Sequence, residues 1–388
     1  MDCLVNTRQK SRVAMADFRQ VSKNKRWYWR VSALSGACMA AYHQSLSSTG
    51  AKTSPAMRHR TIASHFARAV LQGARRYDLD CQPILAQAGI TPELLNEPRA
   101  RIAPEQFALL IQLVWRALDD EYMGFGLAPS KRGTFAMMCH ALIHCRTLDK
   151  ALQRGFRFYG LFADSPRLSL ERDGDWVSLC LDETSLRDPE HFLSESLLVI
   201  WHRLASWLIG QRIRLDHATF AYPKPAHSAE YDLLFYCPMT FDAGQTALTF
   251  HARYLSMPLL QDERTLKRFL ERSPADLLAR PDEGDSLTSQ LRRLLSRDCT
   301  QWPDLEAVAD HLHISPQTLR RHLRDEGTSF QGLKDELRRD MAIFHLGQAD
   351  LSLQQIAEQL GFSEPSAFHR AFKKWTGLTP GAYREKEA

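Results

Sequence analysis

The chain has 388 residues, 44% hydrophobic and 24% charged, with a net charge of +5, which is ordinary for a globular protein. Its length allows two or three domains that each bury a core. No run reaches the roughly 18 uninterrupted apolar residues of a membrane helix. The nearest, 191–210, contains Glu195 and His202 and predicts a buried amphipathic helix. Eight cysteines without a CxxC pair indicate reduced thiols and a cytoplasmic protein.

The first segment of the chain carries most of the positive charge. Residues 1–60 contain eleven Lys or Arg and two Asp, so this segment alone has a charge of about +9 and the rest is slightly acidic. The high overall pI is therefore not in itself a sign of nucleic-acid binding. Residues 31–41 imitate a signal peptide, but small polar residues interrupt the apolar stretch. We expect 1–56 to be a disordered tail, or an extension ahead of a true start at Met57.

Residues 57–280 alternate between helical and strand-like patterns. Apolar periodicity and capping residues predict helices at 62–74, 83–88, 91–95, 104–117, 148–158 and 192–208. Strand-like runs at 167–170 and 176–181 flank a turn at Asp173-Gly174-Asp175, and two further runs occupy 219–222 and 247–250. Hairpin-like spacing of the strands favours an α+β domain over a doubly wound parallel sheet.

One segment of this region resembles a metal site. Cys139, His140, His144 and Cys145 are close in sequence, and two histidines four apart on a helix can share a metal ion. No carboxylate is close in the sequence, however. A helix running from core to rim, with small buried thiols, is the favoured interpretation. We therefore predict no metal and no cofactor.

Other patterns weigh against an enzyme. Gly124-Phe125-Gly126 lacks the glycine spacing and the preceding strand of a phosphate-binding loop, and no G-x-S-x-G motif is present. A group of aromatic residues and methionines is open to two interpretations, a ligand pocket or, as we favour, ordinary core packing. Its members are Met137, Met138, Phe156, Phe158, Tyr159 and Phe162.

The C-terminal region contains an internal repeat. Apolar residues spaced i, i+3, i+4 and i+7 form one helix face twice, the second copy displaced by 48 positions (353 − 305). The two faces are Leu305, Val308, Ala309 and Leu312, then Leu353, Ile356, Ala357 and Leu360. Each short helix is followed by a tight turn that ends in serine, Ser315 or Ser363, which we expect to be the N-cap of a second helix. Gly361 suits a left-handed helix end.

The second helix of each copy is predicted to have a buried face and a basic outer face. The outer faces are Gln317, Arg320, Arg321 and Arg324 in the first copy, and Ser366, His369, Arg370 and Lys373 in the second. Residues 286–388 contain 14 Lys or Arg and 14 Asp or Glu, so positive charge is concentrated on these faces, not abundant. Two short helices joined by a tight turn, with a basic second helix, indicate a helix-turn-helix.

Two connecting segments complete the layout. Leu333, Leu337, Met341 and Phe344 predict a helix between the two units, which would hold their reading helices about one DNA turn, ~34 Å, apart. Upstream, residues 286–297 predict a capped helix. The acidic stretch 282–285 before it is the expected inter-domain hinge.

Two stretches carry a resemblance to a known family. They are Ser315-Pro316-Gln317-Thr318-Leu319-Arg320-Arg321 and the run from Ile356-Ala357 through Leu360-Gly361-Phe362-Ser363-Glu364-Pro365 to Tyr383-Arg384. The match runs almost without gaps from Asp304 to Arg384 and resembles AraC/XylS-type transcription regulators. The resemblance implies an all-α DNA-binding domain over 281–388, with helix-turn-helix units at 304–326 and 352–376.

The same resemblance implies roles for single residues. Base contacts would come from Gln317, Arg320 and Arg321 in the first unit, and from Glu364, Ser366, Ala367 and Arg370 in the second. The chemistry agrees, because Arg pairs with guanine, Gln with adenine, and Glu accepts from cytosine. Arg324 shares the basic face of the first unit. Lys373 and Lys374 would contact phosphates, whereas Gly377, Pro380 and Tyr383 would be structural.

Residues 57–280 more loosely resemble the arabinose-binding-like sensing region of the ornithine-utilisation subgroup of this family. The segments concerned are Gln82-Pro83-Ile84-Leu85-Ala86-Gln87-Ala88-Gly89-Ile90, Gly124-Phe125-Gly126-Leu127 and Phe235-Tyr236-Cys237-Pro238-Met239. The resemblance implies an effector-binding and dimerisation domain, without identifying its pocket residues.

Together these expectations describe a cytoplasmic transcription activator. It would bind double-stranded promoter DNA as a homodimer, contact RNA polymerase, and respond to a small-molecule effector. Two alternatives stay open: a regulator whose N-terminal domain binds no ligand, and an enzyme domain fused to a DNA-binding module.

Overall fold

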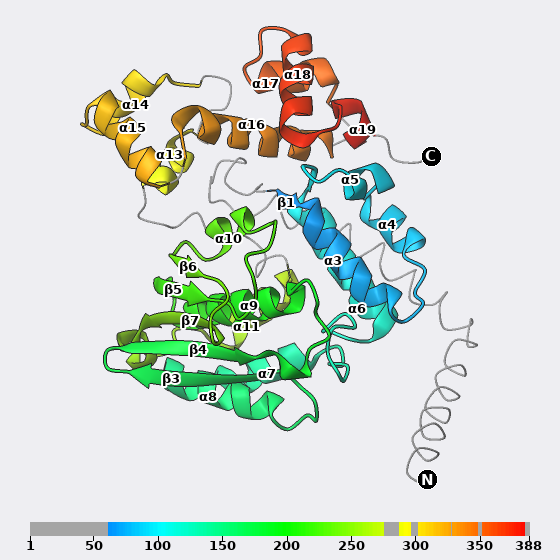
Figure 1. Cartoon of the computed structure of the whole chain (residues 1–388), viewed down its shortest axis with the longest axis vertical. Helices are drawn as coiled ribbons and strands as arrows, with labels where there is room; N and C mark the ends of the chain where they lie inside the picture. The colour runs from blue at the N-terminus through cyan, green and yellow to red at the C-terminus, as the bar shows by residue number, and fades with distance from the viewer. Residues whose placement is uncertain (1–60, 275–286, 296–301, 327, 348–350, 385–388) are drawn as a thin grey trace. The chain divides into compact units, whose positions relative to one another are not determined.

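The computed structural model describes residues 61–274, 287–295, 302–326, 328–347 and 351–384 (Figure 1). The expected tail over 1–56 and the expected hinge at 282–285 lie outside these residues. No helix in the described ranges is long and apolar enough to cross a bilayer.

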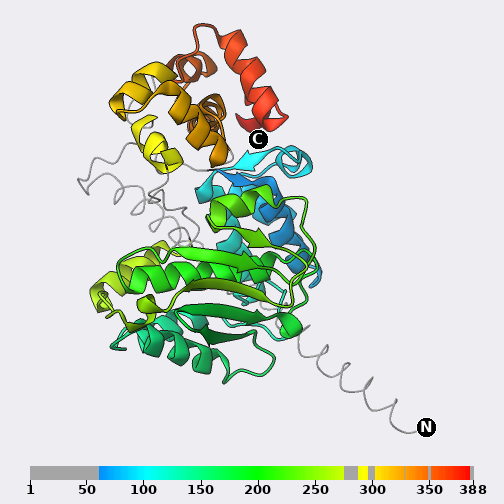
Figure 2. The ribbon, with the colours of Figure 1, turned by 60° about the vertical axis from the view of Figure 1, so that its left-hand side comes forward.

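A five-stranded sheet forms the centre of the N-terminal region (Figure 1; turned by 60° in Figure 2). Its strand order is β3 (Arg167–Asp173), β4 (Trp176–Asp182), β7 (Thr246–His251), β5 (Leu215–Thr219) and β6 (Met239–Thr240). All neighbours are antiparallel except β5 and β6, which are parallel. This mixed, mainly antiparallel sheet confirms the predicted α+β class. The expected hairpin spacing holds for β3 and β4, whereas the helix Phe192–Leu208 separates β4 from β5 and the helix Ala229–Leu234 separates β5 from β6.

The strand predicted at 219–222 is largely wrong. Strand β5 runs from Leu215 to Thr219 and includes a register shift between Leu215 and His217. Beyond Thr219 the backbone N–H of Ala221 donates to the Thr246 Oγ1 side chain, at 3.0 Å, where a ladder would need a carbonyl. Phe220 and Tyr222 are buried and alternate with exposed residues as in a strand, although the ladder between β5 and β7 ends before them.

Most predicted helices of the N-terminal region are present. They are α3 (Ser64–Arg75), α4 (Gln82–Ala88), α5 (Pro92–Asn96), α6 (Pro104–Leu118), α8 (Leu148–Tyr159) and α9 (Phe192–Leu208). The helix expected around 139–145 is α7 (Thr134–Leu142), which begins earlier and ends before His144. The structure adds α10 (Ala229–Leu234), α11 (Glu263–Arg272), and the 3-10 turns η2 (Glu183–Ser185) and η3 (Ala252–Ser256). It also adds a two-stranded pair, β1 (Ile62–Ala63) with β2 (Arg101–Ile102), too short to show a period.

Helix α9 runs through the core of this region. One face of the sheet, with Val177, Leu179 and Leu248, belongs to the same hydrophobic cluster as most buried α9 residues. The opposite face carries a Ser178–Thr249 hydroxyl hydrogen bond of 2.8 Å. The predicted buried helix is therefore confirmed. Its polar residues are accommodated by specific partners inside the domain.

His202 on α9 makes the folded protein sensitive to acid. Its Nε2 donates to the Ile213 carbonyl at 2.8 Å, and burial lowers the pKa of His202 from 6.5 to about 4. As pH falls below 6.5, His202 becomes protonated in the unfolded chain but stays neutral in the folded chain. The free energy of unfolding therefore falls. Between pH 7 and 5 this histidine should remove about 2 kcal/mol.

The His202→Gln variant isolates this effect, since its amide can still donate to Ile213. Urea unfolding at pH 7 and pH 5 should show a pH-dependent loss about 2 kcal/mol smaller in the variant. The pKa of His65, also near 4 because of burial, and that of Asp188, raised by burial to about 6, contribute equally to both proteins. Equal pH dependence of the two proteins would refute the assignment.

Helix α3 and the loop after α6 pack against each other at two glycines, Gly73 and Gly124. A Cβ on Gly73 would lie 2.1 Å from the Met123 carbonyl oxygen and 2.6 Å from the Phe125 ring. Gly124, with φ of +84°, faces the Gly73 carbonyl, and a Cβ there would lie 2.6 Å from it. The two glycines therefore permit a close approach of the two backbone segments.

Gly73→Ala should consequently destabilise the fold. Alanine in an unobstructed helix position gains about 1 kcal/mol over glycine, but overlap with a buried backbone oxygen should turn this into a loss of about 1–3 kcal/mol. Gly347→Ala, where the nearest atom is 3.4 Å away, is the matched control. Urea unfolding measures both. A more stable Gly73→Ala protein would contradict the packing described.

The described part of the C-terminal region contains helices and connecting turns but no strand. Its elements are α13 (Leu287–Leu295), α14 (Leu305–His311), α15 (Pro316–Asp325), α16 (Phe330–Leu346), α17 (Leu353–Gln359), α18 (Pro365–Thr376) and α19 (Pro380–Arg384). Two hydrophobic clusters form its core, one under each repeat. Helix α13 falls within the helix predicted at 286–297, and the order of an α+β region followed by an all-α region is as predicted.

Candidate nucleic-acid interface and an apolar cavity

The first unit consists of α14, a tight turn and α15. Asp304 caps α14, its Oδ1 accepting from the Ala307 N–H at 2.8 Å, and Ser315 caps α15, its Oγ accepting from the Thr318 N–H at 3.1 Å. Between them His313 adopts φ of +56°, at the position that Gly361 occupies in the second unit. The predicted Ser315 cap, with Pro316 as the first helical residue, is confirmed.

The second unit consists of α17, its turn and α18. Ser352 and Gln355 form a reciprocal capping box at the start of α17, and Gly361 is left-handed at φ of +73°, as predicted. The predicted Ser363 cap is wrong. Glu364 occupies the N-cap of α18 without a side-chain cap bond, because Pro365 takes the first helical position one residue later than the repeat spacing implies.

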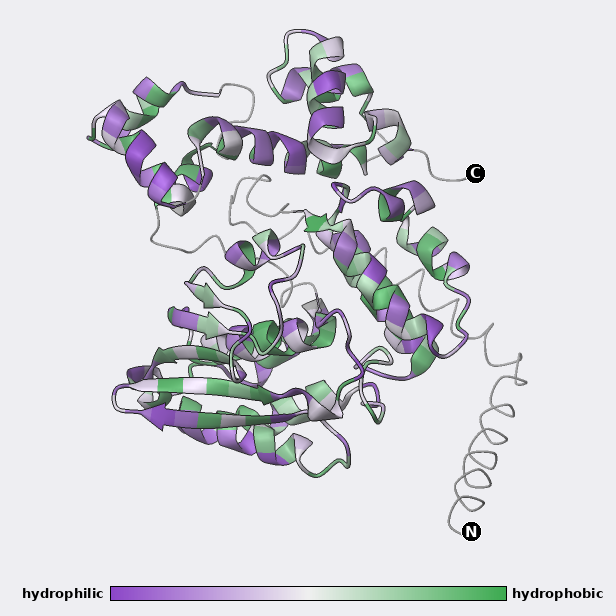
Figure 3. Ribbon diagram, in the orientation of Figure 1, coloured by the Kyte–Doolittle hydropathy of each residue, from purple (hydrophilic) through white to green (hydrophobic). Residues whose placement is uncertain are grey.

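Both second helices have one buried and one exposed face, and Figure 3 shows both in mixed hydrophilic and hydrophobic colours. Leu319 and Leu323 are buried under α15, and Phe368 and Phe372 under α18. The predicted contact residues lie outside: Gln317, Arg320, Arg321, Arg324, Glu364, Ser366, Arg370, Lys373 and Lys374 are exposed, and Ala367 is half-buried. Every predicted side chain except the half-buried Ala367 is therefore well exposed to solvent.

Three of these side chains, those of Arg320, Ser366 and Glu364, have partners within their own unit. Arg320 pairs with Glu306 at 3.3 Å, both side chains being more than half exposed, and Ser366 Oγ donates to Glu364 Oε2 at 3.1 Å. Ion pairs this exposed contribute little to stability. The Arg320 guanidinium can therefore exchange its carboxylate for a nucleic-acid acceptor at small cost.

Helix α16 joins the two units. Leu333 and Leu337 pack in the cluster of the first unit, and Met341 in that of the second, as predicted. Ile343 and Leu346 complete the second half of the stripe; Phe344 is only half-buried, contrary to its predicted place in that stripe.

Arg338 reinforces this joint. Its guanidinium carbon lies 5.0 Å from the ring centroid of Trp302 and 5.2 Å from that of Phe362, a cation–π sandwich. Trp302 packs against both clusters, while Phe362 belongs to the turn of the second unit. The sandwich thus ties the entrance of the first unit to the turn of the second.

The suspected metal residues are held by other contacts. Glu263 of α11 accepts from His140 at 3.2 Å and pairs with His144 at 3.1 Å, so folding supplies a carboxylate that is distant in sequence. Cys139 and Cys145 are buried, and burial raises the pKa of both thiols. In the parts of the chain that the structure describes, no three His, Cys, Asp or Glu side chains form a metal-binding group.

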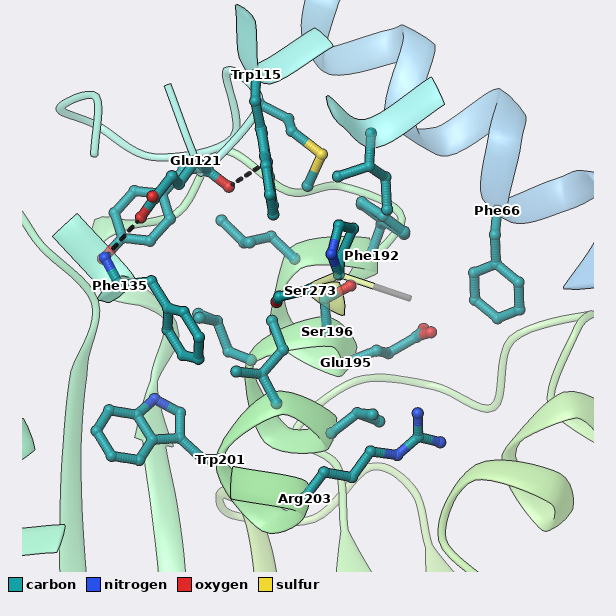
Figure 4. A pocket seen from close by; sticks show the side chains of 18 of the residues that line it. Phe66, Trp115, Glu121, Phe135, Phe192, Glu195, Ser196, Trp201, Arg203 and Ser273 are labelled. Carbon is teal, nitrogen blue, oxygen red and sulfur yellow. Dashed lines mark hydrogen bonds between the residues drawn. The ribbon is translucent and has the colours of Figure 1, made fainter. Parts of the chain in front are cut away.

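The N-terminal region contains an apolar cavity of about 120 Å³. Phe107, Ile111 and Trp115 line it from one face of α6, and Phe66 from α3. Helix α9 contributes residues from Phe192 to Arg203, and Trp115 and Trp201 lie on opposite sides of the cavity in Figure 4. Of the predicted aromatic group only Tyr159 lines it; Phe156 packs in the core against Trp201, with ring centroids 4.9 Å apart.

Glu195 places a carboxylate in this apolar wall. It is 2% exposed, and Figure 4 shows it extending from α9 toward Phe66. Its Oε1 accepts from His227 Nε2 at 3.0 Å and from the Tyr231 hydroxyl, whereas its Oε2 has no partner. Burial raises the pKa of Glu195, and the two hydrogen bonds oppose that shift. Sequence patterns marked Glu195 only as an interruption of an apolar run.

Two family models match the chain. The arabinose-binding domain of AraC transcription regulators matches residues 79–259, and a helix-turn-helix domain matches residues 308–386. The ornithine utilization regulator of Pseudomonas aeruginosa is 30% identical over 322 residues, which are 82% of this chain and 95% of that protein. The chain belongs to the AraC family of transcription regulators.

Further relatives agree with this membership. An uncharacterised HTH-type transcriptional regulator of Mycobacterium tuberculosis is 27% identical over 338 residues, 85% of this chain and 97% of that protein. The crystal structure of the transcriptional regulator CdpR from Pseudomonas aeruginosa is 22% identical, covers 82% of this chain and 98% of its own, and aligns with a TM-score of 0.27. The helix-turn-helix family model, which matches residues 308–386, covers most of both units.

Proposed function

We propose that this AraC-family regulator reads promoter DNA with both helix-turn-helix units at once. The observation that carries the proposal is the pair of exposed polar and basic faces on α15 and α18, attached to the two halves of one continuous helix, α16. A rigid joint fixes the distance between the reading helices. Successive major grooves on one side of a duplex require a separation of about one turn, ~34 Å.

We assign base contacts to Gln317, Arg320 and Arg321 in the first unit, and to Glu364, Ser366, Ala367 and Arg370 in the second. Their exposure and the pairing chemistry of their side chains support this assignment. Arg324, Lys373 and Lys374 are assigned to phosphates, which fix register and give binding its salt dependence.

We further propose that residues 57–280 form an effector-binding and dimerisation domain and 281–388 the DNA-binding domain. The cavity beside α9 supports an effector site, since small ligands bind in apolar cavities with few polar groups. Bound effector would favour the arrangement in which both units engage DNA. The regulator would then act in the cytoplasm as a homodimeric activator that contacts RNA polymerase, with no cofactor and no catalytic activity.

Mobility-shift titration of the full-length protein on the DNA upstream of its own gene tests the proposal. At fixed salt, binding should be sequence-specific and resist competing random DNA, and complex size should report a dimer. A metabolite that raises both affinity and thermal stability would support the effector role. Affinity that no metabolite changes would favour the ligand-independent alternative, and equal affinity for random DNA would overturn the proposal.

A further inference from the structure

The wall of the cavity in the N-terminal region contains a hydrogen-bond acceptor without a partner. Among the described side chains that line it, Glu195 Oε2 is the one buried nitrogen or oxygen atom without a hydrogen-bond partner. Leaving such an atom unpartnered in an apolar interior is costly, and more so for a charged group. A ligand that donates a hydrogen bond to Oε2 would remove this cost.

Two hydrogen bonds stabilise the carboxylate form of Glu195 against the burial that raises its pKa. Its Oε1 already accepts two hydrogen bonds, from His227 and Tyr231, and both donors are held in place. His227 stacks on His65 with ring centroids 3.9 Å apart, and the Tyr231 hydroxyl also bonds to Tyr222 at 3.1 Å. The carboxylate is thus fixed, with one oxygen free to accept.

The other charged groups of the cavity wall are already engaged. Glu121 accepts from the backbone N–H groups of Gly133, at 2.7 Å, and Phe135, at 2.9 Å. Arg203 has a partner within the protein. A ligand would therefore meet one carboxylate oxygen without a partner, at Glu195, a few hydroxyl groups such as those of Ser196 and Ser273, and mainly aliphatic or aromatic carbon elsewhere.

We propose that the cavity binds a small apolar amine, about one ring in size, whose ammonium group donates to Glu195 Oε2. The volume sets the upper limit of size, because an apolar cavity of about 150 Å³ holds a benzene ring and this one, at about 120 Å³, is somewhat smaller. The charge follows from Glu195, since hydrogen bonds between ionised partners are about twice as strong as neutral ones. This inference rests on the proposed effector function and names the ligand class of that site.

Calorimetric titration of the full-length protein with benzylamine, benzyl alcohol and benzoate tests the assignment. The three probes share a ring and differ in the polar group. Benzylamine should bind at least about ten-fold more tightly than either of the others. Equal binding of amine and alcohol would overturn the cationic class, and tighter binding of benzoate would show that Glu195 is protonated and donates.

The Glu195→Gln variant should bind benzylamine at least about ten-fold more weakly than the natural protein does. Glu171→Gln removes an equal charge from an exposed position on β3, and it should leave binding unchanged. If Glu195→Gln binds benzylamine as tightly as the natural protein does, the inference is overturned. If this variant fails to fold, the comparison of the three probes on the natural protein tests the ligand class by itself. DNA binding of the natural protein is measured in parallel by mobility shift without any probe. If the protein binds DNA but does not prefer benzylamine over the other probes, this inference alone is refuted. If it does not bind DNA, the proposed function is refuted.

Discussion

Arg370→Ala is expected to weaken binding to the cognate promoter site by about 1–3 kcal/mol and to relax sequence preference at one base pair. Arg370 is exposed on α18, opposite the buried face formed by Phe368 and Phe372, so its removal should leave the fold intact. A guanidinium in this position can pair with two acceptors of guanine in the major groove. Binding to a panel of single-base site variants measures both effects.

Two variants serve as controls for Arg370→Ala. Lys373→Ala, one helical turn along on the same face, should weaken all sequences alike and reduce the salt slope by about one. Arg116→Ala removes an exposed charge from α6 and should change neither property. If Arg370→Ala lowers affinity equally for every sequence, Arg370 contacts a phosphate, and the base assignment fails.

Phe372→Ala is expected to unfold the second unit while the first stays folded. Phe372 is fully buried, and its ring centroid lies 5.7 Å from that of Phe368 and 4.9 Å from that of Tyr383. Truncating a buried phenylalanine costs about 3–5 kcal/mol, a large fraction of the stability available to a core this small. Hydrogen exchange should show lost protection in α17 and α18, with α14 and α15 still protected.

The control for this variant lies on the opposite face of the same helix. Ser366→Ala alters an exposed side chain and should change stability by less than about 0.5 kcal/mol. A Phe372→Ala protein with undiminished protection in α18 would mean that the cluster under the second unit does not hold that helix. Protection lost in both units together would show that α16 makes them one cooperative domain.

The DNA-binding units were the most predictable part of the molecule. Apolar residues at i, i+3, i+4 and i+7 mark a buried helix face directly, and Ser315 and Gly361 are local signals that act within one turn. The errors were also local. Ser363 has the right chemistry for a cap, but Pro365 fixes the first helical residue and moves the cap to Glu364.

Strand ends were less predictable, because a ladder depends on its neighbour. Phe220 and Tyr222 alternate as a strand should, yet Ala221 bonds to a side chain of β7, and the ladder with β7 ends at Thr219. On the other side the Phe220 N–H still donates to the Thr240 carbonyl at 2.9 Å. Nothing near these residues in the sequence records that the partner offers a hydroxyl, not a carbonyl.

The polar group of the cavity could not be predicted, although Tyr159, one member of the aromatic group, does line the cavity. Glu195 meets His227 and Tyr231 from 32 and 36 positions away, and Glu263 reaches His140 across 123 positions. Such meetings are set by the packing of helices against one another, on which local periodicity carries no information. The sequence did show that α9 is a buried helix with polar residues in it, and that is where the cavity lies.

We propose that one chain reads two adjacent major grooves with its two linked units. Hydroxyl-radical and dimethyl-sulfate footprinting of the full-length protein on its own upstream DNA, at fixed salt, tests this proposal. We expect two protected major-groove segments per monomer, about one helical turn apart on the same side of the duplex, and we expect Arg370→Ala to remove guanine protection from one of them only. A single protected segment per monomer, or protection without sequence preference, would contradict it.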